Sequence, residues 1–135
     1  MRRSILNPII ICIGSVFLLS MSYNASNPQD KWVVPEEYDK MENPYSGIVD
    51  KEGIGEEIYG LYCLTCHGEE GKGDGVNAIL LETSAADFSA ESFKTQSDGS
   101  LFYKIATGRN EMPNFEVIIT EEEDLWLVVN YLRKF

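Results

Sequence analysis

Histidine and cysteine are both scarce in this chain of 135 residues, which contains one histidine and three cysteines. The histidine is His67, and two of the cysteines, Cys63 and Cys66, lie just before it. The third, Cys12, lies in an apolar stretch near the start of the chain and is interpreted as an apolar filler. A structural zinc site usually takes four Cys or His ligands, so a zinc site here would have to recruit a carboxylate.

Basic residues are scarce as well, since 11 Lys and Arg stand against 22 Asp and Glu, for a net charge of −11. Such an acidic chain is a poor match for the phosphate backbone of nucleic acid, and we expect no nucleic-acid partner. The charge indicates either simple solubility or steering towards a partner with a basic docking surface.

The apolar run at the start of the chain, Ile9 to Leu19, is short for a membrane span, which needs about 20 residues. It follows Arg2 and Arg3, and small residues come after it, so residues 1–22 are interpreted as a secretory signal cleaved after Ser22. An uncleaved N-terminal anchor is the alternative. Loss of the two arginines leaves nine basic residues against 22 acidic ones, a net charge of −13.

Residues 63 to 67 read Cys63-Leu64-Thr65-Cys66-His67. Two thiols two residues apart, followed at once by an imidazole, are the attachment pattern of a c-type haem. One helical turn brings both sulfurs to the vinyl edge of the porphyrin and places His67 over the iron as the proximal ligand. We therefore expect one covalent haem c, bound by Cys63 and Cys66.

Two other readings of this motif stay open. A redox dithiol of the thioredoxin kind is usually preceded by a strand within a βαβ pattern, whereas the residues before Cys63 have helical spacing. A zinc site meets the shortage of ligands described above.

The sixth position of the iron needs a ligand other than histidine, because the chain has no second one. After removal of the leader, Met41 and Met112 are the thioether candidates. Met112 precedes Pro113 in a predicted rigid loop, while Met41 lies in an acidic segment. We predict His67 and Met112 as the two metal ligands, with a role for Met112 in core packing as the alternative. A filled sixth position favours electron transfer over catalysis at the iron.

The mature chain divides into an irregular acidic segment, 23–52, and a helical part, 53–135. The first is expected to be an extended arm lying over the surface, or else a disordered tether. Apolar residues at helical spacing predict a helix over 53–67, and four glycines in 68–75 predict a loop. A short helix over 76–82 and another from Ser97 or Asp98 to Gly108 follow.

The last helix has the clearest signals. Thr120 and Glu123 form a capping-box pattern, and four consecutive acids at 121–124 suit the positive end of the helix dipole. The predicted buried stripe repeats at helical spacing and consists of Leu125, Val128, Val129 and Leu132.

Residues 53–135 resemble a class I monohaem cytochrome c of the small bacterial type. The pieces that carry the resemblance are Gly55-x-x-x-Tyr59-x-x-x-Cys63-x-x-Cys66-His67-Gly68, the glycine-rich loop, Met112-Pro113 and Trp126-x-x-x-x-Tyr131-Leu132. The resemblance implies an all-α cytochrome c fold, with three to four short helices around one covalent haem and with crossing N- and C-terminal helices.

The resemblance also implies particular contacts. Gly55 and Tyr59 are expected to pack on Val128 and Tyr131. Val76 stands where the family commonly has a proline whose carbonyl accepts the Nδ1 proton of the proximal histidine, so a carbonyl near residues 75–76 is expected to do this.

The expected function is that of a one-electron carrier between respiratory redox partners, and not an enzyme. A haem-containing subunit of a respiratory complex is one alternative, and a peroxidase-like or gas-binding cytochrome with a displaceable methionine is another. The resemblance implies export to the periplasm, as a soluble or membrane-tethered protein. Arg109 and Trp32 are candidates for hydrogen bonds to the haem propionates, against a solvated arginine and a merely packed tryptophan.

Overall fold

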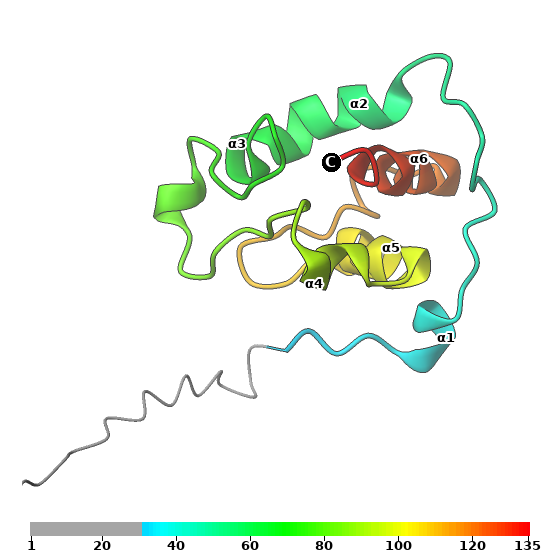
Figure 1. The fold of residues 1–135 in the computed structure, drawn as a ribbon, viewed down its shortest axis with the longest axis horizontal. Helices are drawn as coiled ribbons and strands as arrows, with labels where there is room; N and C mark the ends of the chain where they lie inside the picture. Colours follow the sequence, from blue (N-terminus) through cyan, green and yellow to red (C-terminus); the bar gives the residue numbers. More distant parts are fainter. Residues whose placement is uncertain (1–30) are drawn as a thin grey trace, which may run out of the picture. The chain divides into compact units, whose positions relative to one another are not determined.

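The computed structural model describes residues 31–135, which Figure 1 draws in colour. The predicted leader, with Cys12, and the first part of the acidic segment lie outside these residues. The helices of the described part are α1 (Glu36–Asp39), α2 (Ile54–Ile58), the π-helix η2 (Tyr59–Cys63), α3 (Leu64–His67), the 3-10 helix η3 (Ala78–Leu80), α4 (Glu91–Lys94), α5 (Asp98–Thr107) and α6 (Glu122–Leu132).

Residues 31–135 form no strand, and the nearest approach to one is an isolated bridge between Arg109 and Met112. The prediction of an all-α fold is therefore confirmed. Within the same residues, we find no helix with the length and apolar character that a membrane crossing requires.

One continuous helical stretch, made of α2, η2 and α3, carries the Cys-x-x-Cys-His motif, as predicted for 53–67. The Asp50 carboxylate, just before this stretch, binds the backbone N–H groups at its start. Oδ1 accepts hydrogen bonds from Gly53 and Ile54, and Oδ2 accepts one from Gly55, at 2.9 to 3.1 Å. A carboxylate at this end also suits the helix dipole. The wider π turn just before the motif was not predicted; such turns often lie at functional sites.

Helix α6 packs between α2 and α5 and contributes much of the core. Its Trp126 is fully buried and stacks on Phe102 of α5, with ring centroids 4.2 Å apart. The predicted stripe of Leu125, Val128, Val129 and Leu132 is buried. Figure 1 shows α6 in red beside α2 and α5.

The predicted capping box of α6 is wrong. The helix begins at Glu122, its N-cap is Glu121, and no side chain caps it. The backbone N–H groups of Asp124 and Leu125 bond to the carbonyl of Glu121, so the first turn starts one residue after Thr120. At the start of α5 the prediction holds for Ser97, whose side chain accepts a hydrogen bond from Ser100 N.

Residues from Trp32 onward belong to the same compact unit as the helices. Asp39 accepts hydrogen bonds from the hydroxyls of Ser97 and Ser100 at 2.9 and 2.6 Å. The amide of Asn43 donates to Asp98 and to Asn130, each at 2.9 Å. The acidic segment is therefore fastened to α5 and α6 by side-chain hydrogen bonds.

Candidate functional site

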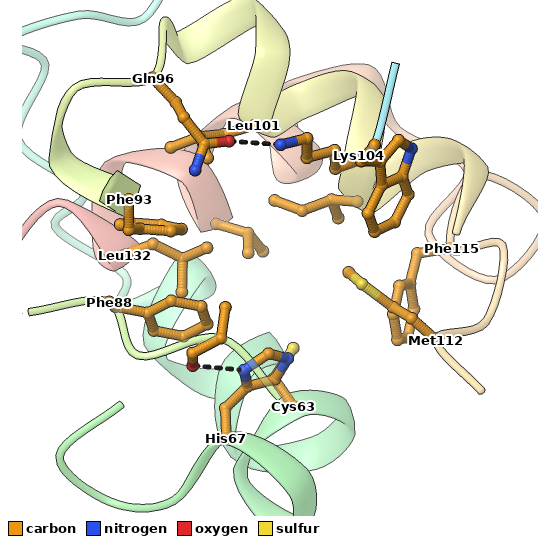
Figure 2. Close-up of a pocket in the computed structure, with 14 residues that line it drawn as sticks. Cys63, His67, Phe88, Phe93, Gln96, Leu101, Lys104, Met112, Phe115 and Leu132 are labelled. Atoms are coloured by element: carbon orange, nitrogen blue, oxygen red, sulfur yellow. Dashed lines mark hydrogen bonds between the residues drawn. The ribbon is translucent and has the colours of Figure 1, made fainter. Parts of the chain in front are cut away.

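A cavity opens between α3, α5, α6 and the loop that precedes α6. Its empty space is about 650 Å³, including the part open to solvent. Its lining is predominantly apolar, and Figure 2 shows the side chains that converge on it. The lining residues are Trp32, Cys63, His67, Ala86, Phe88, Phe93, Gln96, Leu101, Lys104, Ile105, Met112, Phe115, Val128 and Leu132.

Three of the four predicted site residues line this one cavity: Cys63, His67 and Met112. Cys66 is half-buried on α3 and is not among the lining residues. Burial raises the pKa of the Cys63 thiol to about 12, and the neighbouring Cys66 adds to the rise. Reactive dithiols have a lowered thiol pKa, so this environment speaks against the thioredoxin-like reading.

His67 is fixed by two neighbours that follow the glycine-rich loop. Its Nδ1 lies 3.3 Å from the carbonyl oxygen of Ala86, and its ring stacks on Phe88 with centroids 4.6 Å apart. Burial lowers the pKa of His67, although the hydrogen bond to Ala86 opposes this. A neutral imidazole that donates from Nδ1 leaves Nε2 as the ligand atom, the arrangement expected at a metal.

The acceptor predicted near residues 75–76 is therefore wrong, because the structure places the carbonyl of Ala86 against His67. The glycine-rich loop has a different role, since it lets the backbone of 85–88 come close. A Cβ on Gly73 would lie 2.4 Å from the Ala85 oxygen, and Phe88 N bonds to the Gly71 oxygen at 2.7 Å. The loop thus positions the acceptor rather than supplying it.

Tyr59 supports the C-terminal end of α3. Its hydroxyl donates to the carbonyl of Gly68, the residue after His67, and its ring is 2% exposed. Burial raises the pKa of Tyr59 to about 12 from an ordinary 10.0.

We expect a share of the stability to be lost as the pH rises from about 10 to about 12, because the unfolded chain then releases the Tyr59 proton and the folded one keeps it. Below pH 10 this share is present in full. Tyr59→Phe should flatten the decline, and should cost about 1–3 kcal/mol at neutral pH by leaving the Gly68 carbonyl without a partner. Denaturant titrations at several pH values measure both effects. Tyr62→Phe, at an exposed ring, is the control; an unchanged decline in Tyr59→Phe would contradict the assignment.

Met112 lies in a short loop that is held by two backbone hydrogen bonds. Its N–H and carbonyl pair with the carbonyl and N–H of Arg109, both at 2.9 Å. Gly108 turns the chain there with φ +64°, and a Cβ at this position would lie 2.2 Å from the Pro113 oxygen. Figure 2 shows the thioether directed into the cavity from the side opposite Phe88 and Phe93.

Met41, the other methionine of the described residues, is 37% exposed and does not line the cavity. Its carbonyl and Cβ lie against Gly99 at the start of α5. The geometry therefore favours Met112 over Met41 as a ligand.

The residues of the cavity fit a haem. An imidazole with a fixed tautomer and a thioether reach one apolar space, and a thiol lies on the same helix as the imidazole; these are the donor types of a His/Met c-type site. Within residues 31–135 no group of three or more His, Cys, Asp or Glu side chains is arranged to hold a metal ion, which speaks against the zinc reading.

Comparisons with known proteins identify the family of this chain. Residues 51–132 match the family model described as "Cytochrome C oxidase, cbb3-type, subunit III". The chain belongs to this family of c-type cytochrome domains. No curated protein matches the chain. The predicted recognition as a small monohaem c-type cytochrome is confirmed, and with it the cytochrome c fold.

Two solved structures illustrate the likeness. The KustC0563 c-type cytochrome is 26% identical, with a TM-score of 0.51, and the match covers 60% of this chain and 95% of that one. A chain of the Kuenenia stuttgartiensis reducing HAO-like protein complex Kustc0457/Kustc0458 is 24% identical with a TM-score of 0.57. That match covers 78% of this chain and 52% of the other, and at 24% identity this second likeness concerns the fold alone.

Sequence reasoning missed Ala86, Phe88, Gln96 and Lys104 as site residues. For Ala86 there was no signal, because a backbone acceptor can be any residue type. For Lys104 there was one: it lies three residues after Leu101 and one before Ile105, so helical spacing places it on the apolar face of α5. Trp32 does line the cavity, and Arg109 lies over its ring.

Proposed function

We propose that this c-type cytochrome is a one-electron carrier whose haem is attached to Cys63 and Cys66 and ligated by His67 and Met112. The observation that carries the proposal is that His67 and Met112 line the same apolar cavity from different segments of the chain. Haem, when bound there, supplies a ferric/ferrous couple and so exchanges single electrons. The family's chemistry is haem-based electron transfer, which agrees with this role.

The protein's own residues hold the proposed ligands in place and give the site an apolar lining. Ala86 holds the His67 ring in one tautomer, and Phe88 stacks against it. The closed backbone pairing between residues 109 and 112 fixes the loop that presents the thioether. The mostly apolar lining offers water few hydrogen-bond partners, and a thioether ligand would favour the ferrous state.

Two measurements on the mature protein test the proposal. A potentiometric titration should show one reversible one-electron wave, and the ferric spectrum at neutral pH should be low-spin with a methionine–iron charge-transfer band. A substantial high-spin fraction would instead favour the peroxidase-like or gas-binding alternative, because it reports an open sixth position.

We propose export to the periplasm, since c-type cytochromes are typically exported and residues 1–22 have the pattern of a secretory signal. Whether the leader is cleaved decides between a free and a tethered protein. The mass of the mature N-terminus distinguishes the two.

We propose a redox partner with a basic docking surface, on the strength of the net charge of −11. The rate of electron transfer to a cationic partner should fall about tenfold or more between low salt and about 0.5 M salt, because the ions screen the attraction. Stopped-flow rates across this range provide the measurement. A flat profile would leave the exposed apolar side chains of η3, Ile79 at 89% and Leu80 at 76% exposure, as the better docking surface.

A second candidate role is that of a haem module within a larger respiratory assembly. It is favoured by the family's description as an oxidase subunit. Size-exclusion chromatography of detergent-solubilised membranes would separate the roles, since a shuttle elutes at the size of one small domain.

A further inference from the structure

The cavity is polar at only one part of its lining. Apart from the proposed haem-binding groups, the side chains with a charge or an amide are those of Lys104 and Gln96. In Figure 2 these two lie together at the end of the cavity away from Cys63 and His67, with the Lys104 ammonium donating to the Gln96 amide oxygen. A lysine directed into an apolar cofactor pocket calls for a ligand of opposite charge.

Two cations share one aromatic face at this end. The Lys104 ammonium lies 5.7 Å from the centre of the Trp32 ring, and the Arg109 guanidinium lies 4.7 Å from it. Burial lowers the pKa of Lys104 and the charge of Arg109 lowers it further, while Asp39 opposes this. Both causes disfavour the charged lysine unless an anion is present.

The Asp39 carboxylate favours the charged form of Lys104 only from a distance. No ion pair joins Lys104 to a carboxylate of residues 31–135. The nearby Asp39 uses its Oδ1 to accept from Ser97 and Ser100. The Lys104 charge, which has no direct ion pair within residues 31–135, is therefore placed to meet an anionic group that enters the cavity.

We propose that Lys104, held by Gln96 and seated on Trp32 beside Arg109, binds a propionate carboxylate of the haem. The porphyrin carries its vinyl groups on one half and its two carboxylates on the other. Lys104 lies at the end of the cavity away from Cys63, so a haem attached by its vinyl half to Cys63 and Cys66 would have its carboxylates on the side of Lys104. The inference rests on the proposed function, because it requires haem in this cavity.

The proposal gives the acidic segment a part in the cofactor site. Trp32 lies outside residues 51–132, which match the family model, yet its ring lies under both cations and lines the cavity. The side chain that positions Lys104 thus comes from a segment that the family domain does not include. Lys104 thus binds the carboxylate end of the cofactor, and Trp32 is the positioning residue that acts through Lys104.

Lys104→Leu in the mature protein tests this, with Lys104→Arg as the conservative variant. The propionate bending mode in the resonance Raman spectrum responds to hydrogen bonds to that carboxylate. We expect this mode to shift in Lys104→Leu, and the midpoint potential to fall, because a nearby cation favours the ferrous state. Lys104→Arg should restore the potential. Lys51→Leu removes an exposed lysine before α2 and should change neither readout.

Failure of the Lys104 assignment and failure of the proposed function give different results. A wild-type protein without covalent pigment on a denaturing gel overturns the proposed function. A pigmented Lys104→Leu protein with an unchanged propionate mode overturns the Lys104 assignment alone. If Lys104→Leu yields too little pigmented protein, Lys104→Gln is measured in the same way, and an unchanged propionate mode in that variant overturns the assignment equally.

Discussion

Met112→Ala is expected to abolish the methionine–iron charge-transfer band and to lower the midpoint potential by on the order of 0.1 V or more, within the roughly 0.8 V that axial ligands span. The physical reason is the loss of a thioether that stabilises ferrous iron. The half-buried Met112 lies on a loop held at 2.9 Å to Arg109, so the backbone should persist after the change. Visible spectra of both oxidation states and a potentiometric titration provide the measurements.

Met41→Ala is the matched control for this experiment. It removes the other thioether of the described residues, at a 37% exposed position that does not line the cavity. Its spectrum and potential should equal those of the wild type. Loss of the band in Met41→Ala, with retention in Met112→Ala, would reverse the ligand assignment.

Gly55→Ala should destabilise the fold by about 2 kcal/mol or more, in the range of overpacked cores. A Cβ on Gly55 would lie 2.3 Å from the Leu127 carbonyl oxygen and 3.1 Å from the Tyr131 Cβ, so the backbone of α6 must move away. The gain in helix propensity, about 1 kcal/mol, does not offset this. Denaturant unfolding of the pigmented protein measures the loss.

Gly60→Ala is the control on the same helical stretch. Nothing lies within 4 Å of a Cβ built there, and its φ is not positive. We expect a stabilisation of up to about 1 kcal/mol, opposite in sign to that of Gly55→Ala. Equal losses in both variants would show that the close contact between α2 and α6 is not what requires Gly55.

The predicted packing of the first helical stretch on α6 was correct in part. Tyr59 does pack on Tyr131, with ring centroids 5.3 Å apart. The nearest atoms to a Gly55 side chain belong to Leu127 and Tyr131, however, and Val128 is not among them. The motif therefore predicted which helices meet, but not which residue of α6 lies against Gly55. The π turn of η2 was not predicted either, because no periodicity in the sequence marks it.

The site was predictable where its chemistry needs a particular side chain. Cys63, His67 and Met112 were predicted as site residues from their types and spacing, and the structure places them around one cavity. The Ala86 acceptor was not predicted. The position of a main-chain oxygen depends on loop geometry, which the residue type does not determine. The failure at Thr120 has a similar cause: the helix began where the carbonyl of Glu121 took up its first hydrogen bonds.

The most direct test of the central claim is the mass of the denatured mature protein, followed by mapping of its peptides. We expect the mass of the polypeptide plus one haem, with the increment on the peptide that contains Cys63 and Cys66. Cys63→Ala combined with Cys66→Ala should remove the increment. A wild-type mass equal to that of the bare polypeptide, or pigment that extracts into acid acetone, would contradict the account.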